Sequence, residues 1–301
     1  MIEIWIPLTI LAAFLQNLRS AFQKHLKSSL STAGASYVRF LYACPFAIMY
    51  CLGISYFFEV PIPEPNQTFL IFCFLGGISQ ILFTILLIYL FSFRSFAVGT
   101  IYSKTEVIQV AFLSLIFLGD EISIIAIAAI FISVIGVIIL SASKSDTQIR
   151  SIFLSLFKRT TIIGLACGAF LGASSVFYRG ASLSLENANL GMRAAFALAV
   201  SVIIQSVLMG IYLKIKEPGQ ITKIFQNWRP ALTVGVAGVL GSICWFTAFT
   251  IQNAAYVRAL GQIELIFTFI ASIVFFREKT KINEVIGICL ITLSIIILLL
   301  N

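Results

Sequence analysis

Two glutamates stand in the middle of apolar runs, at equivalent points of a repeated stretch. Glu106 lies within residues 97–121, and Glu264 follows 158 positions later within residues 255–279. A carboxylate in the middle of an apolar span costs on the order of 3 kcal/mol. Because this cost recurs at the same point of both copies, we predict that the two carboxyl groups have a function. A poorly solvated carboxyl group favours its neutral form, so either glutamate could exchange a proton.

The alternative for each glutamate is a fixed structural ion pair. Lys104 and Arg258 are basic residues on the same two predicted helices. Residues pair along one helix when they are three or four positions apart. Lys104 precedes Glu106 by two positions, and Arg258 precedes Glu264 by six. Any partner of either glutamate must therefore come from another helix or from a substrate.

Basic side chains outnumber acidic ones inside the apolar runs. Against the two glutamates, six lie in or at the ends of these runs: Arg19, Arg39, Lys104, Arg179, Arg193 and Arg258. This excess favours a substrate that carries a carboxylate or a phosphate. Lys104 and Arg258 are the stronger candidates, because they share helices with the glutamates. Arg39 and Arg193 occupy matching positions of the repeats, which suits a scaffold role.

Neutral side chains complete the candidate site. Five of them could provide hydrogen bonds and an aromatic wall: Gln80, Tyr102, Gln109, Trp245 and Gln262. In the first apolar run the polar residues Gln16, Asn17 and Arg19 allow two interpretations. They line a cavity, or Arg19 extends along the helix to the membrane surface.

The composition indicates which elements must position these residues. The chain has 301 residues, of which 60% are hydrophobic and 11% charged, and its mean hydropathy is +1.05. Soluble domains average about 25% charged residues, so we predict an all-α polytopic membrane protein. A helix needs roughly 20 apolar residues to cross a bilayer. Windows of that size predict ten spans, at residues 4–22, 33–57, 68–93, 96–118, 122–142, 161–183, 189–213, 230–251, 254–276 and 282–300.

The distribution of charge predicts the orientation. Fourteen of the 20 Lys and Arg residues lie in or beside the odd-numbered loops, and the even-numbered loops and both termini hold none. Short cytoplasmic loops collect Lys and Arg. We therefore expect the odd loops in the cytoplasm and both termini on the opposite side of the cell (inner) membrane. The net charge of +8 is then a property of the loops, and we expect no nucleic-acid partner.

A polar stretch divides the chain near its middle. We predict that residues 143–160 form a cytoplasmic linker between a first repeat at 1–142 and a second at 161–301, with five spans in each. An odd number of spans inserts the second repeat upside down relative to the first. Many secondary transporters have such inverted repeats and bind substrate near the midplane where the repeats meet.

Other classes of site lack a pattern in this sequence. The six cysteines all lie inside predicted spans without a CxxC pair, which is typical of apolar packing residues. The sequence has no HExxH, phosphate-binding loop or nucleophile triad. We expect no enzyme, no metal site and no cofactor.

The ends of the fourth and ninth predicted spans carry a family motif. It reads Glu106-Val107 to Gly119-Asp120 in one copy and Glu264-Leu265 to Arg277-Glu278 in the other. With the ten-span layout, it makes the sequence resemble the EamA-type transporters of the drug/metabolite transporter superfamily along nearly its whole length. That resemblance implies ten helices in two inverted repeats and a carrier of small metabolites. Val107 and Leu265 replace the proline of the family motif, so we expect straighter helices there.

The leading hypothesis is a secondary-active, proton-coupled exporter of amino acids or similar zwitterions. It would work by alternating access around a central cavity, as a monomer or a homodimer in the lipid bilayer. The excess of basic residues favours an exchanger of anionic metabolites as an alternative. A flippase for lipids or lipid-linked sugars and a purely structural membrane subunit remain open as further alternatives.

Overall fold

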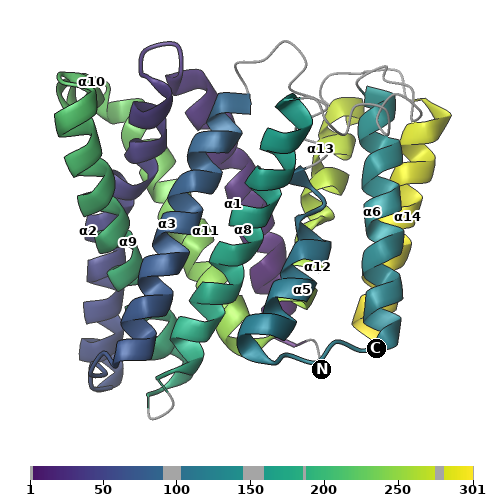
Figure 1. Cartoon of the computed structure of the whole chain (residues 1–301), viewed down its shortest axis with the longest axis horizontal. Helices are drawn as coiled ribbons and strands as arrows, with labels where there is room; N and C mark the ends of the chain where they lie inside the picture. The colour runs from purple at the N-terminus through teal and green to yellow at the C-terminus, as the bar shows by residue number, and fades with distance from the viewer. Residues whose placement is uncertain (1–2, 91–102, 145–158, 186–187, 275–280, 301) are drawn as a thin grey trace.

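The computed structural model describes residues 3–90, 103–144, 159–185, 188–274 and 281–300, and within these ranges it is helical without strands. Figure 1 shows most of its helices standing side by side. Their bounds are α1 Trp5–Leu26, α2 Thr32–Phe58, α3 Gln67–Leu90, α5 Glu106–Leu118, α6 Ile124–Lys144, α8 Arg159–Leu183, α9 Leu190–Lys216, α10 Gln220–Gln226, α11 Trp228–Ile251, α12 Ala254–Gly261, α13 Ile263–Val274 and α14 Ile282–Leu300.

Six of these helices are long and apolar enough to cross a bilayer, namely α2, α3, α8, α9, α11 and α14. The apolar helices at 106–118 and 124–140 are shorter. A chain with six such helices is a multi-pass integral membrane protein. The count of ten spans stays a prediction.

Polar side chains fix where several helices begin. Ser31 and Asn189 precede α2 and α9, and each accepts a hydrogen bond from a free backbone N–H of the first turn. Asn253 does the same for α12 and so starts a new helix only two residues after α11 ends. Gly119 ends α5 in the left-handed conformation, with φ of 65°, and its N–H bonds the carbonyls of Ser114 and Leu115.

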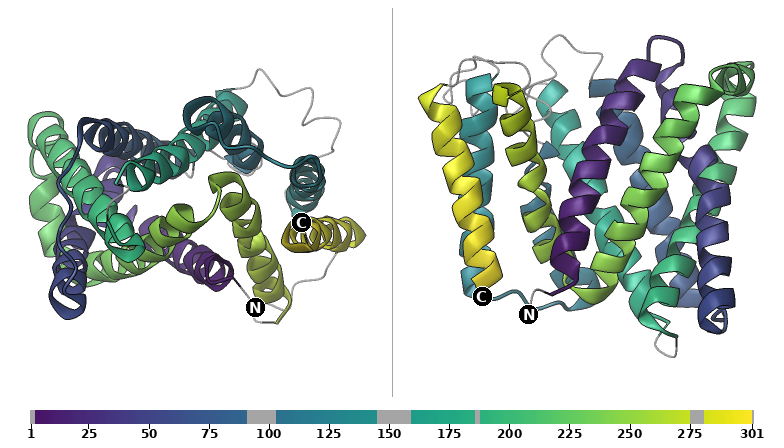
Figure 2. Two further views of the ribbon diagram at one scale, coloured as in Figure 1. Left: turned by 90° about the horizontal axis from the view of Figure 1, so that it is seen from below. Right: turned by 180° about the vertical axis from the view of Figure 1, so that it is seen from behind.

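The helices pack mainly against helices that are distant in the sequence. The principal pairs are α1 with α11, α2 with α9, α3 with α8, and α6 with α14. The two predicted repeats therefore interleave and do not form two separate bundles. Both termini lie at one end of the molecule, and α6 and α14 stand together at one side (Figures 1 and 2). Close approach of α6 and α14 depends on Gly287, whose Cβ would lie 2.8 Å from the carbonyl oxygen of Gly136.

The expected straight helices around the glutamates are not found. Gln262 interrupts the ninth predicted span and separates α12 from α13, although no proline is present. In the described part of the fourth span, a turn at Lys104 and Thr105 precedes α5, which begins at Glu106. The straighter helices expected from Val107 and Leu265 are therefore not observed in the ninth predicted span, which is interrupted at Gln262. The interruption lies where Gly261 packs on Trp245, since a Cβ there would come within 2.8 Å of the indole.

Candidate functional site

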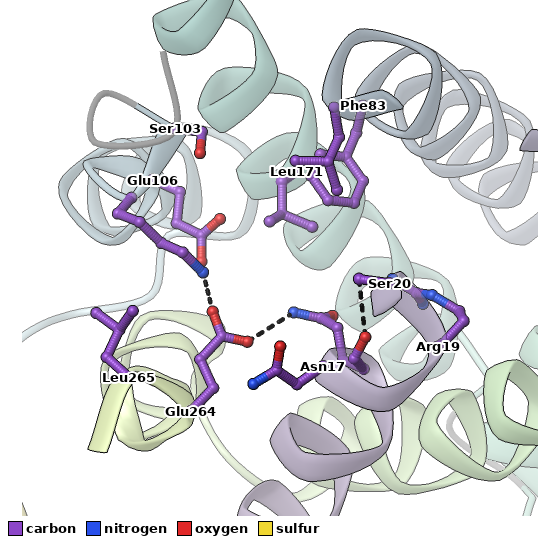
Figure 3. A pocket seen from close by; sticks show the side chains of 12 residues that line it. Asn17, Arg19, Ser20, Phe83, Ser103, Glu106, Leu171, Glu264 and Leu265 are labelled. Atoms are coloured by element: carbon purple, nitrogen blue, oxygen red, sulfur yellow. Dashed lines mark hydrogen bonds and ion pairs between the residues drawn. The ribbon is translucent and has the colours of Figure 1, made fainter. Parts of the chain in front are cut away.

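A cavity of about 200 Å³ lies between α1, α3, α5, α8 and α13. Its walls carry charges of both signs, as Figure 3 shows. The lining residues are Gln16, Asn17, Arg19, Ser20, Phe83, Leu87, Ser103, Lys104, Glu106, Leu171, Glu264 and Leu265. Ser20 lies in the second half of α1, and Leu87 lies in the last turn of α3. The cavity is therefore nearer to the end of the molecule where α1 and α3 finish, away from the termini.

One ion pair lies on the wall of this cavity. The Nζ of Lys104 donates to Oε1 of Glu264, and the Nε2 of Gln16 donates to Oε2 of Glu264 at 3.4 Å. The side chains of Lys104 and Glu264 are 18% and 11% exposed. Both ions keep access to the cavity. The pair can therefore open without leaving a charge in a dry interior.

A second ion pair is more deeply buried. The Nη2 of Arg258 donates to Oε1 of Glu106 at 2.5 Å, and the two side chains are 4% and 3% exposed. The guanidinium of Arg258 also lies over the ring of Trp245, 4.7 Å from the ring centroid. Trp245 in turn stacks on Phe249. Arg258 is thus held on two sides.

Both glutamates occupy the first turn of a helix, Glu106 in α5 and Glu264 in α13. The N-terminal end of a helix favours negative charge. Because each interruption creates a helix N-terminus beside a glutamate, it stabilises the carboxylate and offsets part of the cost of its apolar surroundings. α5 and the residues just before it can pack closely against α8 because α8 has glycines at the contact. A Cβ at Gly168 would lie 2.8 Å from the Ser103 carbonyl, and one at Gly172 would lie 3.0 Å from Val110.

The other predicted site residues lie outside the cavity wall. Gln109 donates to Thr105, in the turn that precedes α5, at 3.5 Å, and Gln262 is buried at the interruption. Gln80 accepts from Gln205 at 3.4 Å, in a separate packed region around Arg39. Trp245 contacts Arg258 and does not reach the cavity. Tyr102 lies outside the described residues.

The structure places three of the six basic residues at sites that need no substrate. Arg179 donates from Nε to Asp120 at 3.0 Å and from Nη1 to the carbonyls of Phe249 and Gln252 at 2.9 and 2.8 Å. Arg193 donates to the Ala188 carbonyl at 2.8 Å. Arg258 pairs with Glu106. The positions of Arg39 and Arg193 are not equivalent, because Arg39 is buried well inside α2 and donates to Thr84 at 3.2 Å.

The sequence-based site residues do not include those of α1. Gln16, Asn17, Arg19 and Ser20 form one wall of the cavity. The available signal was the cluster of polar residues in the second half of the first apolar run. Arg19 is only 3% exposed, so it does not extend to the surface. The cavity interpretation of these residues is the correct one.

Comparisons with known proteins assign the family. The sequence model of the EamA-like transporter family matches residues 3–142 and again residues 158–300. A solved crystal structure described only as that of a protein superposes with a TM-score of 0.69 at 12% identity, over 99% of this chain and 96% of that chain. At that identity the likeness shows the fold alone. No curated protein sequence matches significantly.

Two matches that together cover nearly the whole chain leave no large part of it unassigned. They agree with the helical membrane fold described above. The chain therefore belongs to the EamA-like transporter family and is a membrane transporter of the drug/metabolite transporter superfamily.

Proposed function

We propose that this protein is a proton-coupled secondary-active exporter of small zwitterionic metabolites such as amino acids. The observation that carries the proposal is the Lys104–Glu264 ion pair on the cavity wall. Its carboxylate can hold the Lys104 ammonium, a proton or the ammonium of a substrate, one at a time. Competition among these three couples proton movement to substrate movement.

The proposed cycle is alternating access between two ends of one cavity. The cavity lies toward the end where α1 and α3 finish, and the opposite half of the interior is filled by Trp245, Phe249 and Arg258. Arg179 ties α8 to the ends of α5 and α11 in that filled half. If the odd loops are cytoplasmic, this conformation faces inward. The Arg179 contacts then form the closed outer gate.

The proposed architecture is ten spans in two inverted repeats, at residues 1–142 and 161–301, with a linker at 143–160. Support comes from the two family matches at 3–142 and 158–300. The helix pairs support it too, because α1 with α11 mirrors α8 with α3 when the two segments are exchanged. We further propose the cell (inner) membrane as its location, with monomer or homodimer both compatible.

The size of the cavity favours a small metabolite over a lipid-linked sugar. Sites for drug-sized ligands enclose about 300–1,000 Å³, whereas this cavity measures about 200 Å³. Charges of both signs line it, and a zwitterion complements both. An exchanger of anionic metabolites is the second candidate, because one wall carries the uncompensated cation Arg19.

The test is transport by the Glu264→Gln variant in proteoliposomes with an imposed pH gradient. We expect wild-type protein to accumulate radiolabelled amino acids from a mixed pool against their gradient. Glu264→Gln should lose this pH-driven accumulation, because glutamine cannot exchange a proton. Glu64→Gln, on an exposed loop, is the matched control and should behave as wild type. Normal accumulation by Glu264→Gln would refute proton coupling at this residue.

A further inference from the structure

Two buried arginines in this transporter lack a carboxylate partner. Four basic side chains reach the described interior, namely Arg19, Arg39, Lys104 and Arg258. The interior carboxylates of the described chain are Glu106 and Glu264, and Arg258 and Lys104 already pair with them. Arg19 and Arg39 are left with uncompensated positive charge. Buried charge of this kind is strongly unfavourable unless an anion pairs with it.

Arg19 is the one of the two that faces the cavity. It lines the cavity wall and is 3% exposed, and within the described chain its Nε has no hydrogen-bond partner. Arg39 is oriented away, where it donates to Thr84 beside almost no empty space. Gly238 separates the two stems, since its Cβ would lie 3.5 Å from Cδ of Arg19 and 3.6 Å from Cγ of Arg39.

The charged neighbours of Arg19 do not neutralise it. Arg39 lies beside it across Gly238, and like charges repel. Within the described ranges the carboxylates of Glu106 and Glu264 pair with Arg258 and Lys104, so Arg39 adds positive potential beside Arg19. This potential attracts an anion to the wall formed by α1.

We propose that Arg19 binds the carboxylate of the transported substrate, with Arg39 contributing positive potential from behind. This inference rests on the proposed function and names the group that the substrate must carry. Arg19 and Glu264 line the same cavity, and Figure 3 shows Asn17 and Ser20 of α1 between them. A substrate with a carboxylate and an ammonium would place the carboxylate at Arg19 and the ammonium at Glu264.

A carboxylate fits the site better than a phosphate. The planar guanidinium of arginine matches a carboxylate through two parallel hydrogen bonds. A phosphate dianion would also meet the carboxylates of Glu106 and Glu264, which line the same cavity. Repulsion between like charges disfavours the dianion there. The proposed ligand group is thus a monoanion.

The experiment measures thermal unfolding of the purified full-length protein in sodium acetate, sodium phosphate and sodium chloride at equal ionic strength. Acetate serves as the carboxylate probe, since a ligand that binds the folded state raises the unfolding temperature. We expect an acetate increment above chloride in the wild type and no such increment in Arg19→Gln. Arg193→Gln removes an arginine outside the cavity and should keep the wild-type increment.

Ligand-free Arg19→Gln gives the second readout. Removing an uncompensated buried cation should leave the unfolding temperature unchanged or raise it, whereas removing a structural arginine should lower it. The conservative variant Arg19→Lys should retain part of the acetate increment. An acetate increment that is absent in the wild type or equal in Arg19→Gln would overturn the proposal. A larger increment from phosphate than from acetate would overturn the carboxylate assignment.

A substrate-like pair completes the test. L-Alanine should stabilise the wild type more than L-alaninamide, which keeps the ammonium and lacks the carboxylate. The difference should vanish in Arg19→Gln. These binding measurements need neither transport nor a pH gradient. An absence of pH-driven accumulation in the wild type with an intact acetate increment would refute the proposed function alone. Accumulation by the wild type without an acetate increment would refute the Arg19 subsite alone.

Discussion

At the scale of single residues, two glutamates at equivalent positions of a repeat have different surroundings. The Lys104–Glu264 pair is 18% and 11% exposed, and the Arg258–Glu106 pair is 4% and 3% exposed. Glu264 can therefore open its pair toward the cavity, whereas Glu106, which also lines the cavity, holds Arg258 in a more deeply buried pair. The sequence predicts both glutamates and both basic residues as candidates. It cannot distinguish their roles, because each partner lies about 150 residues away in the chain.

Replacing Glu106 should cost more stability than replacing Glu264. Glu106→Gln leaves Arg258 with an uncompensated buried charge, and breaking such a pair costs about 3–5 kcal/mol. Glu264→Gln should cost less, because Lys104 remains in contact with the cavity. Thermal unfolding of both variants in the same detergent measures the difference. Equal losses would show that the two pairs are energetically alike.

A double variant distinguishes the stability lost with the ion pair from the stability lost through changed packing. Glu106→Gln combined with Arg258→Met removes both charges and keeps most of the side-chain volume. Replacing a buried pair by apolar groups is often neutral, so the double variant should recover much of the stability lost in Glu106→Gln. No recovery would assign the loss to packing around Trp245.

At the scale of elements, the sequence predicts most helices and misses how two of them are interrupted. The apolar windows match α2, α3, α8, α9, α11 and α14, because a long run of apolar residues has few other folds in a membrane. No proline or glycine pair in the ninth predicted span signals the interruption at Gln262. The single glycine beside it is Gly261. The interruption lies where Gly261 meets Trp245 of α11, which is a tertiary contact.

The contacts of Arg179 join three elements at the end of the molecule that holds the termini. Arg179→Gln removes the ion pair with Asp120 and weakens the bonds to the Phe249 and Gln252 carbonyls. We expect faster hydrogen–deuterium exchange in residues 116–124 and 246–256, since these segments lose their shared partner. Arg193→Gln, at the same end of the bundle, is the control. Unchanged exchange in both segments would exclude Arg179 as a gate.

At the scale of the whole molecule, the helical membrane fold agrees with the prediction from composition, and the family agrees with the resemblance that the repeated motif carries. The family match appears twice, and the described residues are helical. The interleaving of helices from the two matched segments was not predictable from hydropathy, because hydropathy identifies spans and not their neighbours. α1 with α11 and α3 with α8 are the clearest examples.

The orientation of the molecule is directly testable through its C terminus. Both termini lie at one end, and the basic odd loops predict that this end faces away from the cytoplasm (Figure 1). A C-terminal green fluorescent protein fusion should therefore stay dark in a bacterial host, and a C-terminal alkaline phosphatase fusion should be active. A fluorescent fusion with inactive phosphatase would reverse the orientation and the assignment of the inward-facing state.

The ion pairs described here share one arrangement. Within the described ranges, Lys104–Glu264, Arg258–Glu106 and Arg179–Asp120 each join a residue of the segment matched at 3–142 to one of the segment matched at 158–300. In these three pairs, neither segment supplies its own countercharge. Each depends on the other for its countercharges, as the subunits of an obligate heterodimer do, although both are translated as one polypeptide.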